Sequence, residues 1–348
     1  MNSKSVPMVS VLMLAYNHAP YIRQALDGVI MQRVNFTYEI LIHDDASNDG
    51  TADIIREYEM RYPKIIKPIY QNENQYSKGA SMVKFNRERA FGKYVALCEC
   101  DDCWTDAYKL QIQVDFLENH PEYVATTHKF RYMDSNGKLM NEDIKVLSIL
   151  YESPVFTLKN ATNGALPGHI ATIVHRNIFL NYDQSTKELF YNCPLSGDRK
   201  LSFCLVAGGD IYCIDRYMSN YRCNLSGDSW SSKNYQENMI GEAYRTVLES
   251  SRFMKDAFGI TLDNSELALS IIIKAYISSL ILHDKNLRKE LFSQRSATIM
   301  YLHILLRKLV THPIGIAANL FKVYKMYVRS KDERVYGRNC KYLTHKNI

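Results

Sequence analysis

The chain has 348 residues, of which 46% are hydrophobic and 23% are charged. This length allows one large domain or two ordinary ones, and such a chain buries enough apolar surface to fold without disulfides or structural metals. The composition excludes a disordered tail, a coiled coil, a collagen-like fibre and a protein with several membrane spans. Eight cysteines in so long a chain do not form a disulfide scaffold.

The beginning of the sequence, MNSKSVPMVSVLML, passes from a short polar leader directly into an apolar run. This is not the pattern of a secretory signal peptide. The sequence also lacks the roughly 18 consecutive apolar residues that a membrane-spanning helix needs. We therefore expect a cytoplasmic protein whose cysteines are reduced.

The net charge of +6 is concentrated at the C-terminal end. Residues 301–348 contain ten lysines and arginines against two acids, a balance of +8, so the rest of the chain carries −2. A basic tail on a near-neutral body indicates contact with an anionic partner at the tail, and we expect no nucleic-acid partner. Segment 299–328 is apolar, aromatic and basic, which suits an interfacial helix on the inner membrane face. It equally suits a helical subdomain with solvated lysines and arginines, and both alternatives stay open.

The first hundred residues alternate between apolar runs of strand length and patterns of helical spacing. This alternation predicts an α/β fold in which helices cover both faces of a parallel sheet. The expected strands are 9–16, 38–44, 65–70 and 93–99, and the expected helices are 20–30, 51–61 and 80–91.

The pattern continues less regularly up to about residue 230. We expect a helix at 107–120, strands at 123–133 and 170–176, a helix at 199–207 and a strand at 210–216. From about residue 235 glycine and proline become rare and helical spacing dominates. We therefore predict two domains, 1–232 and a helical, basic C-terminal region 233–348.

Acidic residues follow two of the expected strands. Asp44-Asp45 ends one strand, and Glu99-Cys100-Asp101-Asp102 comes directly after another. One Asp pair is common in turns, but the carboxyl ends of parallel strands share one crevice, where two such groups repel each other without a counter-ion. A hard divalent cation, Mg²⁺ or Mn²⁺, resolves the repulsion and usually also holds a substrate phosphate. The spacing thus indicates a metal and a phosphate-bearing ligand.

Three segments in this order resemble family 2 glycosyltransferases with the GT-A fold: VSVLMLAYN at 9–17, YEILIHDDASNDGT at 38–51 and GKYVALCECDDCW at 92–104. The resemblance spans about residues 8–230, and the stretch from Ser196 to Trp230 is similar to the acceptor half of that family. It implies a Rossmann-like, mostly parallel sheet flanked by helices. It also implies a nucleotide-sugar half at about 1–122 and an acceptor half at about 123–232.

The resemblance implies roles for individual residues on the donor side. Tyr16 would lie against the nucleobase, between Ala15 and Asn17, and Asp45, after Asp44, would accept a hydrogen bond from the imide N–H of uracil. The metal motif would be Glu99-Cys100-Asp101, with Asp101 as the main ligand and Asp102 supporting the metal or the ribose. The donor-nucleotide set is Ala15, Tyr16, Asn17, Asp44, Asp45, Glu99, Cys100 and Asp101, and the metal ligands are Asp101 and Asp102.

On the acceptor side, the resemblance makes Asp198 the general base, although an Asp at this position could simply cap a helix. The implied activity is inverting, metal-dependent transfer of a hexosyl or N-acetylhexosaminyl group. The donor would be a UDP-sugar, the cofactor Mn²⁺ or Mg²⁺, and the acceptor a hydroxyl of a glycan or lipid-linked glycan in surface polysaccharide or glycolipid synthesis.

Two other classes stay open. A sugar-nucleotide nucleotidyltransferase has a similar sheet, but its first loop is glycine-rich, and here that loop reads AYNHAPYI. A non-catalytic nucleotide- or glycan-binding homologue is the other class, and an intact set of Asp45, Asp101 and Asp198 argues against it.

Some positions depart from the family pattern or have no clear assignment. Glu99 stands where Asp is commoner, and Asn86 matches the usual Asn-x-Gly segment only weakly. His169 could touch the acceptor or the diphosphate, although a plain loop histidine is the simpler interpretation. Arg222 could reach the diphosphate.

Overall fold

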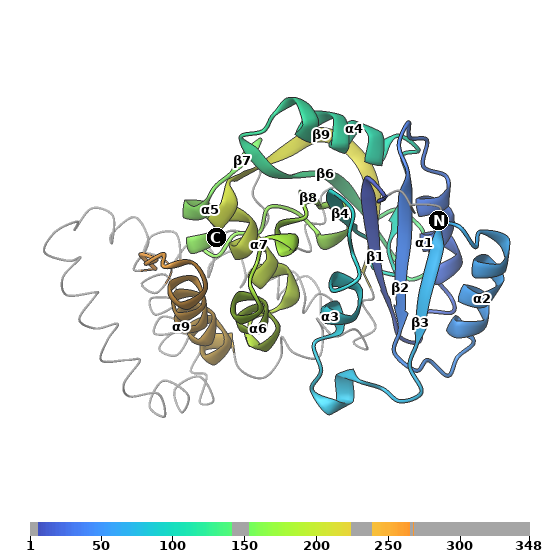
Figure 1. Cartoon of the computed structure of the whole chain (residues 1–348), viewed down its shortest axis with the longest axis horizontal. Coiled ribbons are helices and arrows are strands. Elements are labelled where there is room, and N and C mark those ends of the chain that lie inside the picture. The colour runs from blue at the N-terminus through green and yellow to red at the C-terminus, as the bar shows by residue number, and fades with distance from the viewer. Residues whose placement is uncertain (1–5, 141–152, 224–238, 265–266, 268–348) are drawn as a thin grey trace, which may run out of the picture.

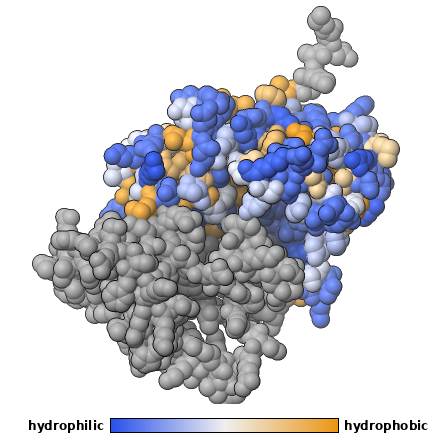
Figure 2. Space-filling model, turned by 90° about the horizontal axis from the view of Figure 1, so that it is seen from below, coloured by the Kyte–Doolittle hydropathy of each residue, from blue (hydrophilic) through white to orange (hydrophobic). Residues whose placement is uncertain are grey.

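The computed structural model describes residues 6–140, 153–223, 239–264 and 267, with the side chains of 239–245 not included. The described part is a mixed α/β structure built on one curled sheet with helices on both sides (Figure 1). The predicted boundary near residue 232 and the basic tail 301–348 lie outside the described residues. Figure 2 shows a largely hydrophilic surface on one side, with apolar residues gathered in limited patches.

The sheet has nine strands in the order β3-β2-β1-β4-β8-β6-β9-β5, with β7 paired to β9. They are β1 (Val9–Ala15), β2 (Tyr38–Asp44), β3 (Ile66–Tyr70), β4 (Tyr94–Leu97), β5 (Cys103–Trp104), β6 (Tyr123–Met133), β7 (Val155–Phe156), β8 (Val174–Arg176) and β9 (Asp210–Arg222).

The helices are α1 (Ile22–Ile30), α2 (Thr51–Arg61), α3 (Met82–Arg87), α4 (Lys109–Asn119), α5 (Leu158–Thr162), α6 (Gln184–Asn192), α7 (Gly197–Gly208) and α9 (Met239–Phe258). Short 3₁₀ turns are η1 (Tyr76–Lys78), η2 (Ile170–Thr172) and η3 (Ile178–Leu180). Most of the elements expected from the sequence are present, although α3 is shorter than the expected 80–91 and β9 extends six residues beyond the expected end at 216.

Parallel pairing is confined to parts of the sheet. Strands β1 to β4 pair in parallel, as the alternation of strands and helices predicts. Beyond β4, strand β8 runs antiparallel to both β4 and β6, whereas β6 and β9 form a long parallel pair that arches over the molecule (Figure 1). The change from parallel to antiparallel pairing therefore lies between β4 and β8, and β5 also pairs antiparallel with β9.

The expected strand 170–176 is wrong over its first four residues. Residues Ile170–Thr172 form the turn η2, and only Val174–Arg176 is a strand. The cause is His169, because its Nδ1 accepts the Ala171 N–H at 3.3 Å and its carbonyl accepts the Thr172 hydroxyl at 2.6 Å. A side chain that caps a turn in this way competes with the strand.

Two hydrophobic clusters fill the two faces of the sheet. On β1, Val9, Val11 and Met13 belong to the first cluster, together with side chains of α1, α2 and α4, and Leu12 belongs to the second. This split follows from the alternation of side chains along a strand. Helix α9 joins the second cluster through Phe253 and Met254, so this helix of the C-terminal region packs on the domain. Among the helices that the structure describes, none is long and apolar enough to cross a bilayer.

A glycine on α1 allows close approach to the strand that follows the second acidic motif. A Cβ added at Gly28 would lie 2.6 Å from the carbonyl oxygen and 3.0 Å from the nitrogen of Trp104 in β5. Both are backbone atoms, which cannot rotate away. Residue 28 must therefore lack a side chain for β5 to reach its place.

We predict that Gly28→Ala lowers the free energy of unfolding by about 1–3 kcal/mol, the usual cost of overpacking. Denaturant unfolding measures this. The matched control is Gly208→Ala at the end of α7, where the nearest atom, Cγ2 of Val124, would be at an ordinary 3.6 Å. Equal stability of the two variants would contradict the close contact.

Candidate active site

The loops after β1 and β2 are joined by hydrogen bonds. The Asn17 N–H donates to Ser47 Oγ at 2.9 Å, and the Asn48 N–H donates to Asn17 Oδ1 at 3.0 Å. Two more backbone N–H groups of the first loop donate to side chains beyond β2: His18 N–H to Thr51 Oγ1 at 2.8 Å and Ala19 N–H to Asp49 Oδ2 at 2.9 Å. The two loops thus form one rigid rim at the carboxyl ends of the first two strands.

Within this rim, the predicted donor residues Ala15, Tyr16 and Asp45 are neighbours. The Asp45 N–H donates to the Ala15 carbonyl at 3.0 Å, and Tyr16 is 48% exposed. An exposed aromatic ring at the rim is available for stacking, as its predicted role requires. Asn17 has a φ of 54°, a left-handed conformation that Asn tolerates better than most residues.

The carboxylates of Asp44 and Asp45 are both buried. Asp45 accepts the Gln75 N–H at 2.7 Å and the Tyr76 N–H at 3.1 Å, one on each oxygen. Asp45 therefore holds the loop after β3 against the rim, and a contact with a nucleobase would have to use its remaining lone pairs. Asp44 Oδ2 accepts the Ser47 N–H at 3.3 Å, whereas its buried Oδ1 has no hydrogen-bond partner.

Between these residues, Ala46 adopts a φ of 59°. This conformation is unfavourable for a residue with a Cβ and persists where the surroundings enforce it. Here the bonds of Asp45 to Ala15 and of Ser47 to Asp44 hold both sides of the turn.

The second acidic motif meets a histidine from the other half of the domain. One ligand atom from each of Glu99, Asp102 and His169 lies within 4.8 Å of the others. His169 Nδ1 is 3.4 Å from Asp102 Oδ2, and its Nε2 is 3.8 Å from Glu99 Oε2. Burial lowers the pKa of His169 to about 3, so its imidazole is neutral, and the lone pair on Nδ1 could bind a metal in place of the Ala171 N–H. We call these three residues the acidic cluster.

Asp102 is the most constrained member of the acidic cluster. Its Oδ1 accepts the Arg222 N–H at 2.8 Å, while its buried Oδ2 has no hydrogen-bond partner. Desolvation raises the pKa of Asp102, and the charges of Asp101 and Glu99 raise it further. A bare carboxylate oxygen facing a neutral imidazole and a second carboxylate fits a divalent cation, which would remove this penalty.

The other predicted residues of this motif are placed differently. Asp101, the expected main ligand, is outside the set of three atoms, although its charge raises the pKa of both Glu99 and Asp102. Cys100 is completely buried in the first hydrophobic cluster, so its backbone alone could contact a donor. Glu99 has a side chain that is 47% exposed, so it can reach a ligand in the crevice.

Arg222 holds this acidic loop in place. Its Nε donates to the Asp101 carbonyl at 2.8 Å, and its guanidinium also donates to the carbonyls of Asp134 and Ser135 and to Gln24 Oε1. With its donors used in this way, Arg222 acts as a clamp in this structure. The geometry does not support the expected contact of Arg222 with a diphosphate, because the guanidinium donates to acceptors of the protein itself.

Asp198 lies in the first turn of α7, two residues after the N-cap Ser196. It is not the cap itself, and its carboxylate accepts the Ser196 hydroxyl and the Arg199 N–H. The charge of Asp198 contributes to the raised pKa of Glu99, after desolvation and Asp101. The predicted base on α7 is therefore close to the acidic cluster.

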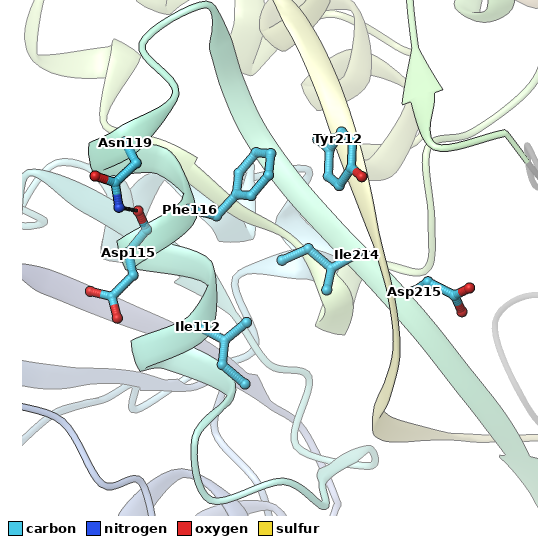
Figure 3. Close-up of a pocket in the computed structure, with 7 residues that line it drawn as sticks. All are labelled: Ile112, Asp115, Phe116, Asn119, Tyr212, Ile214 and Asp215. Atoms are coloured by element: carbon cyan, nitrogen blue, oxygen red, sulfur yellow. Dashed lines mark hydrogen bonds between the residues drawn. The ribbon is translucent and has the colours of Figure 1, made fainter.

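Sequence reasoning gave His169 no firm role and missed its place beside the carboxylates. Seventy residues separate it from Glu99, and no spacing rule connects them. Asn86 was a weak candidate for a donor contact, but its amide donates to the Met13 carbonyl at 2.8 Å inside the core. The groove in Figure 3 lies elsewhere, between α4 and β9, where Phe116, Tyr212 and Ile214 face one another, and none of the predicted site residues lines it.

Residues 10–179 match the family model Glycosyl transferase family 2. These residues therefore form a glycosyltransferase family 2 domain. The match explains why the acidic residues follow β2 and β4, as predicted, and it covers the rim, the acidic cluster and His169. Asp198 lies beyond it.

Curated relatives match somewhat more than a third of the chain. The uncharacterized protein Rv1520 of Mycobacterium tuberculosis is 43% identical over 129 residues, which is 37% of each chain. The uncharacterized glycosyltransferase alr2836 of Nostoc sp. is 34% identical over 134 residues, 38% of this chain and 40% of the relative. The matches thus span about two fifths of the length of these relatives.

A solved structure extends the likeness to most of the chain. S. aureus TarS 1–349, in complex with UDP-GlcNAc, superposes with a TM-score of 0.59 at 15% identity, covering 93% of this chain and 91% of that one. At this identity the likeness concerns the fold. The predicted GT-A fold is confirmed.

We predict that Asp45→Asn loosens the loop after β3, because an amide cannot accept both the Gln75 and the Tyr76 N–H. Hydrogen bonds to a charged group contribute about 1.5–3 kcal/mol, so amide exchange at these two residues should accelerate at least tenfold. Hydrogen-exchange NMR measures this, with Asp53→Asn on the exposed side of α2 as the control. Unchanged exchange at residues 75 and 76 would show that Asp45 does not anchor the loop.

Proposed function

We propose that this protein is an inverting, metal-dependent glycosyltransferase that moves a sugar from a UDP-sugar to an acceptor hydroxyl. The observation that carries the proposal is the meeting of the acidic cluster with Asp198. One half of the domain supplies carboxylates suited to a metal and a diphosphate, and the other supplies an ionisable base beside them. This combination is what displacement at an anomeric carbon requires.

On the donor side, Tyr16 would stack on the base and the rim around Asp45 would hold the nucleoside. TarS was solved with UDP and with UDP-GlcNAc, which supports a UDP-sugar as the donor for this chain. Glu99, Asp102 and His169, with Asp101 beside them, would hold Mn²⁺ or Mg²⁺. Such a cation, when bound, would neutralise the negative charge that develops on the departing diphosphate.

On the acceptor side, Asp198 would take the proton of the attacking hydroxyl. It lies in the first turn of α7, where its carboxylate accepts the Arg199 N–H. One base and no protein nucleophile correspond to a single displacement, which inverts the anomeric configuration.

The acceptor we propose is a glycan or lipid-linked glycan in surface polysaccharide or glycolipid synthesis. One relative, TuaG of Bacillus subtilis, carries a name that places it in teichuronic acid biosynthesis, and it is 38% identical over 112 residues. Membrane attachment through the basic tail 301–348 and a cytoplasmic location stay predictions, since the tail lies outside the described residues.

The structure argues against a nucleotidyltransferase. In the loop AYNHAPYI, the N–H groups of Asn17, His18 and Ala19 all donate to side chains of the neighbouring loop. They are therefore not free to surround a triphosphate, as a glycine-rich loop would do. The non-catalytic alternative differs from our proposal in turnover, which the second experiment below measures.

We predict that UDP binds at least tenfold more tightly with Mn²⁺ than with EDTA. Titration calorimetry on wild type and on Asp102→Asn tests this, because loss of a ligand carboxylate should abolish most of the metal effect. Asp53→Asn, an exposed acid on α2, is the control and should behave as wild type. Equal UDP affinity with and without metal would refute the metal assignment.

We predict that Asp198→Asn lowers sugar transfer by about 10²–10⁴, the usual contribution of a general base, and leaves UDP affinity within twofold. The matched control is Asp183→Asn, another carboxylate that binds a helix N-terminus, the Thr186 N–H of α6. Transfer above half of the wild-type rate in Asp198→Asn would exclude the role. A wild type that binds UDP and turns over no donor would support the non-catalytic alternative.

A further inference from the structure

A group of aromatic rings lies next to the acidic cluster. Phe130 and Tyr132 of β6 and Tyr221 of β9 have ring centroids 5.2–6.2 Å apart and meet edge to face. The register explains the group, because Tyr132 pairs with Tyr221 and Phe130 is two residues before Tyr132 on the same face of the strand. We call these three residues the aromatic wall.

The aromatic wall reaches the acidic cluster through His169. The ring of Tyr221 is 4.0 Å from the imidazole of His169, and that of Phe130 is 5.7 Å away. The same imidazole lies 3.4 Å from Asp102 Oδ2 and 3.8 Å from Glu99 Oε2. The wall and the cluster therefore border the same space.

The aromatic wall is not part of the hydrophobic core. All three rings are half-buried, and none belongs to either of the two hydrophobic clusters found among the described residues. The opposite face of β6 carries cationic side chains, because Lys129 and Arg131 lie there against the ring of Tyr217. Aromatic side chains that join no core cluster and turn toward a polar site call for a ligand with an apolar face.

We propose that the aromatic wall binds a pyranose ring, either of the donor or of the acceptor. A sugar ring has one or both faces formed by C–H groups, which pack on aromatic surfaces, and an edge of hydroxyls, which the tyrosine hydroxyls and nearby carboxylates bind. The location beside the acidic cluster and Asp198 fits a ring that takes part in the reaction. This inference rests on the proposed glycosyltransferase function and names the residues that select its sugar.

The test uses the full chain with Mn²⁺ and compares Phe130→Leu and Tyr221→Leu with wild type. Leucine removes the flat ring and keeps an apolar side chain. Tyr221→Phe keeps the ring and removes only the hydroxyl, so it should lose less affinity than Tyr221→Leu. The control is Tyr217→Leu, which removes an exposed ring from the opposite face of the same strand pair. Tyr132→Leu repeats the measurement if Tyr221→Leu does not fold.

Calorimetry with UDP and with UDP-GlcNAc, and UDP release from UDP-GlcNAc with and without p-nitrophenyl hexopyranosides, separate the two sugars. If the wall holds the donor sugar, the leucine variants bind UDP normally and UDP-GlcNAc about tenfold more weakly. If it holds the acceptor, both affinities and the rate of donor hydrolysis are unchanged, and the KM for the glycoside rises about tenfold.

If the wild type is active and the leucine variants are indistinguishable from Tyr217→Leu, the aromatic wall does not bind the sugar. The proposed function would remain intact. A wild type that binds UDP but consumes no donor would refute the proposed function and the acceptor-binding alternative with it. The comparison of UDP-GlcNAc with UDP would then decide whether the wall holds the donor sugar. A wild type that binds neither would overturn both.

Discussion

The buried carboxylate of Asp102 is the constraint around which this site is arranged. One oxygen is fixed by the backbone N–H of Arg222, and the other is out of water with no donor beside it. Such an atom costs free energy in the folded protein unless a cation approaches. The fold thus places a buried carboxyl group where a cation could bind, and the neighbouring Glu99, Asp101 and His169 define where that cation would lie.

The geometry of Asp102 depends on an arginine that touches four parts of the chain. Arg222 ends β9, the last strand of the domain, and its guanidinium connects the acidic loop, the turn at 134–135 and helix α1. Because the acidic loop follows β4, the bond between residues 102 and 222 connects this loop to the end of β9. The site is thus formed by segments that lie about 120 residues apart in the sequence.

The sequence predicted the local part of this arrangement well. The buried strands and the helices between them have strong periodicity, so their limits were predicted within a few residues for α2 and β2. The positions of Asp44, Asp45 and Asp102 followed from the rule that parallel strands end at one edge. What could not be predicted were contacts that depend on how distant segments cross. His169 reaches the carboxylates because η2 replaces the first part of an expected strand, and the clamp by Arg222 depends on the path of β9. The anchoring of Asp45 to the loop after β3 depends on backbone N–H groups, which leave no trace in the residue types.

The hydrogen bonds between the loops after β1 and β2 have a consequence for how donor preference can change. Asn17 exchanges hydrogen bonds with Ser47 and Asn48, so a substitution in one loop leaves a partner in the other without its bond. Effects of substitutions in such contacting residues are not additive. In the nucleotide-binding role that we propose for the rim, a change of nucleotide preference would therefore require substitutions in both loops together. Variants changed only at residues 16–19 would mostly lose hydrogen bonds between the loops.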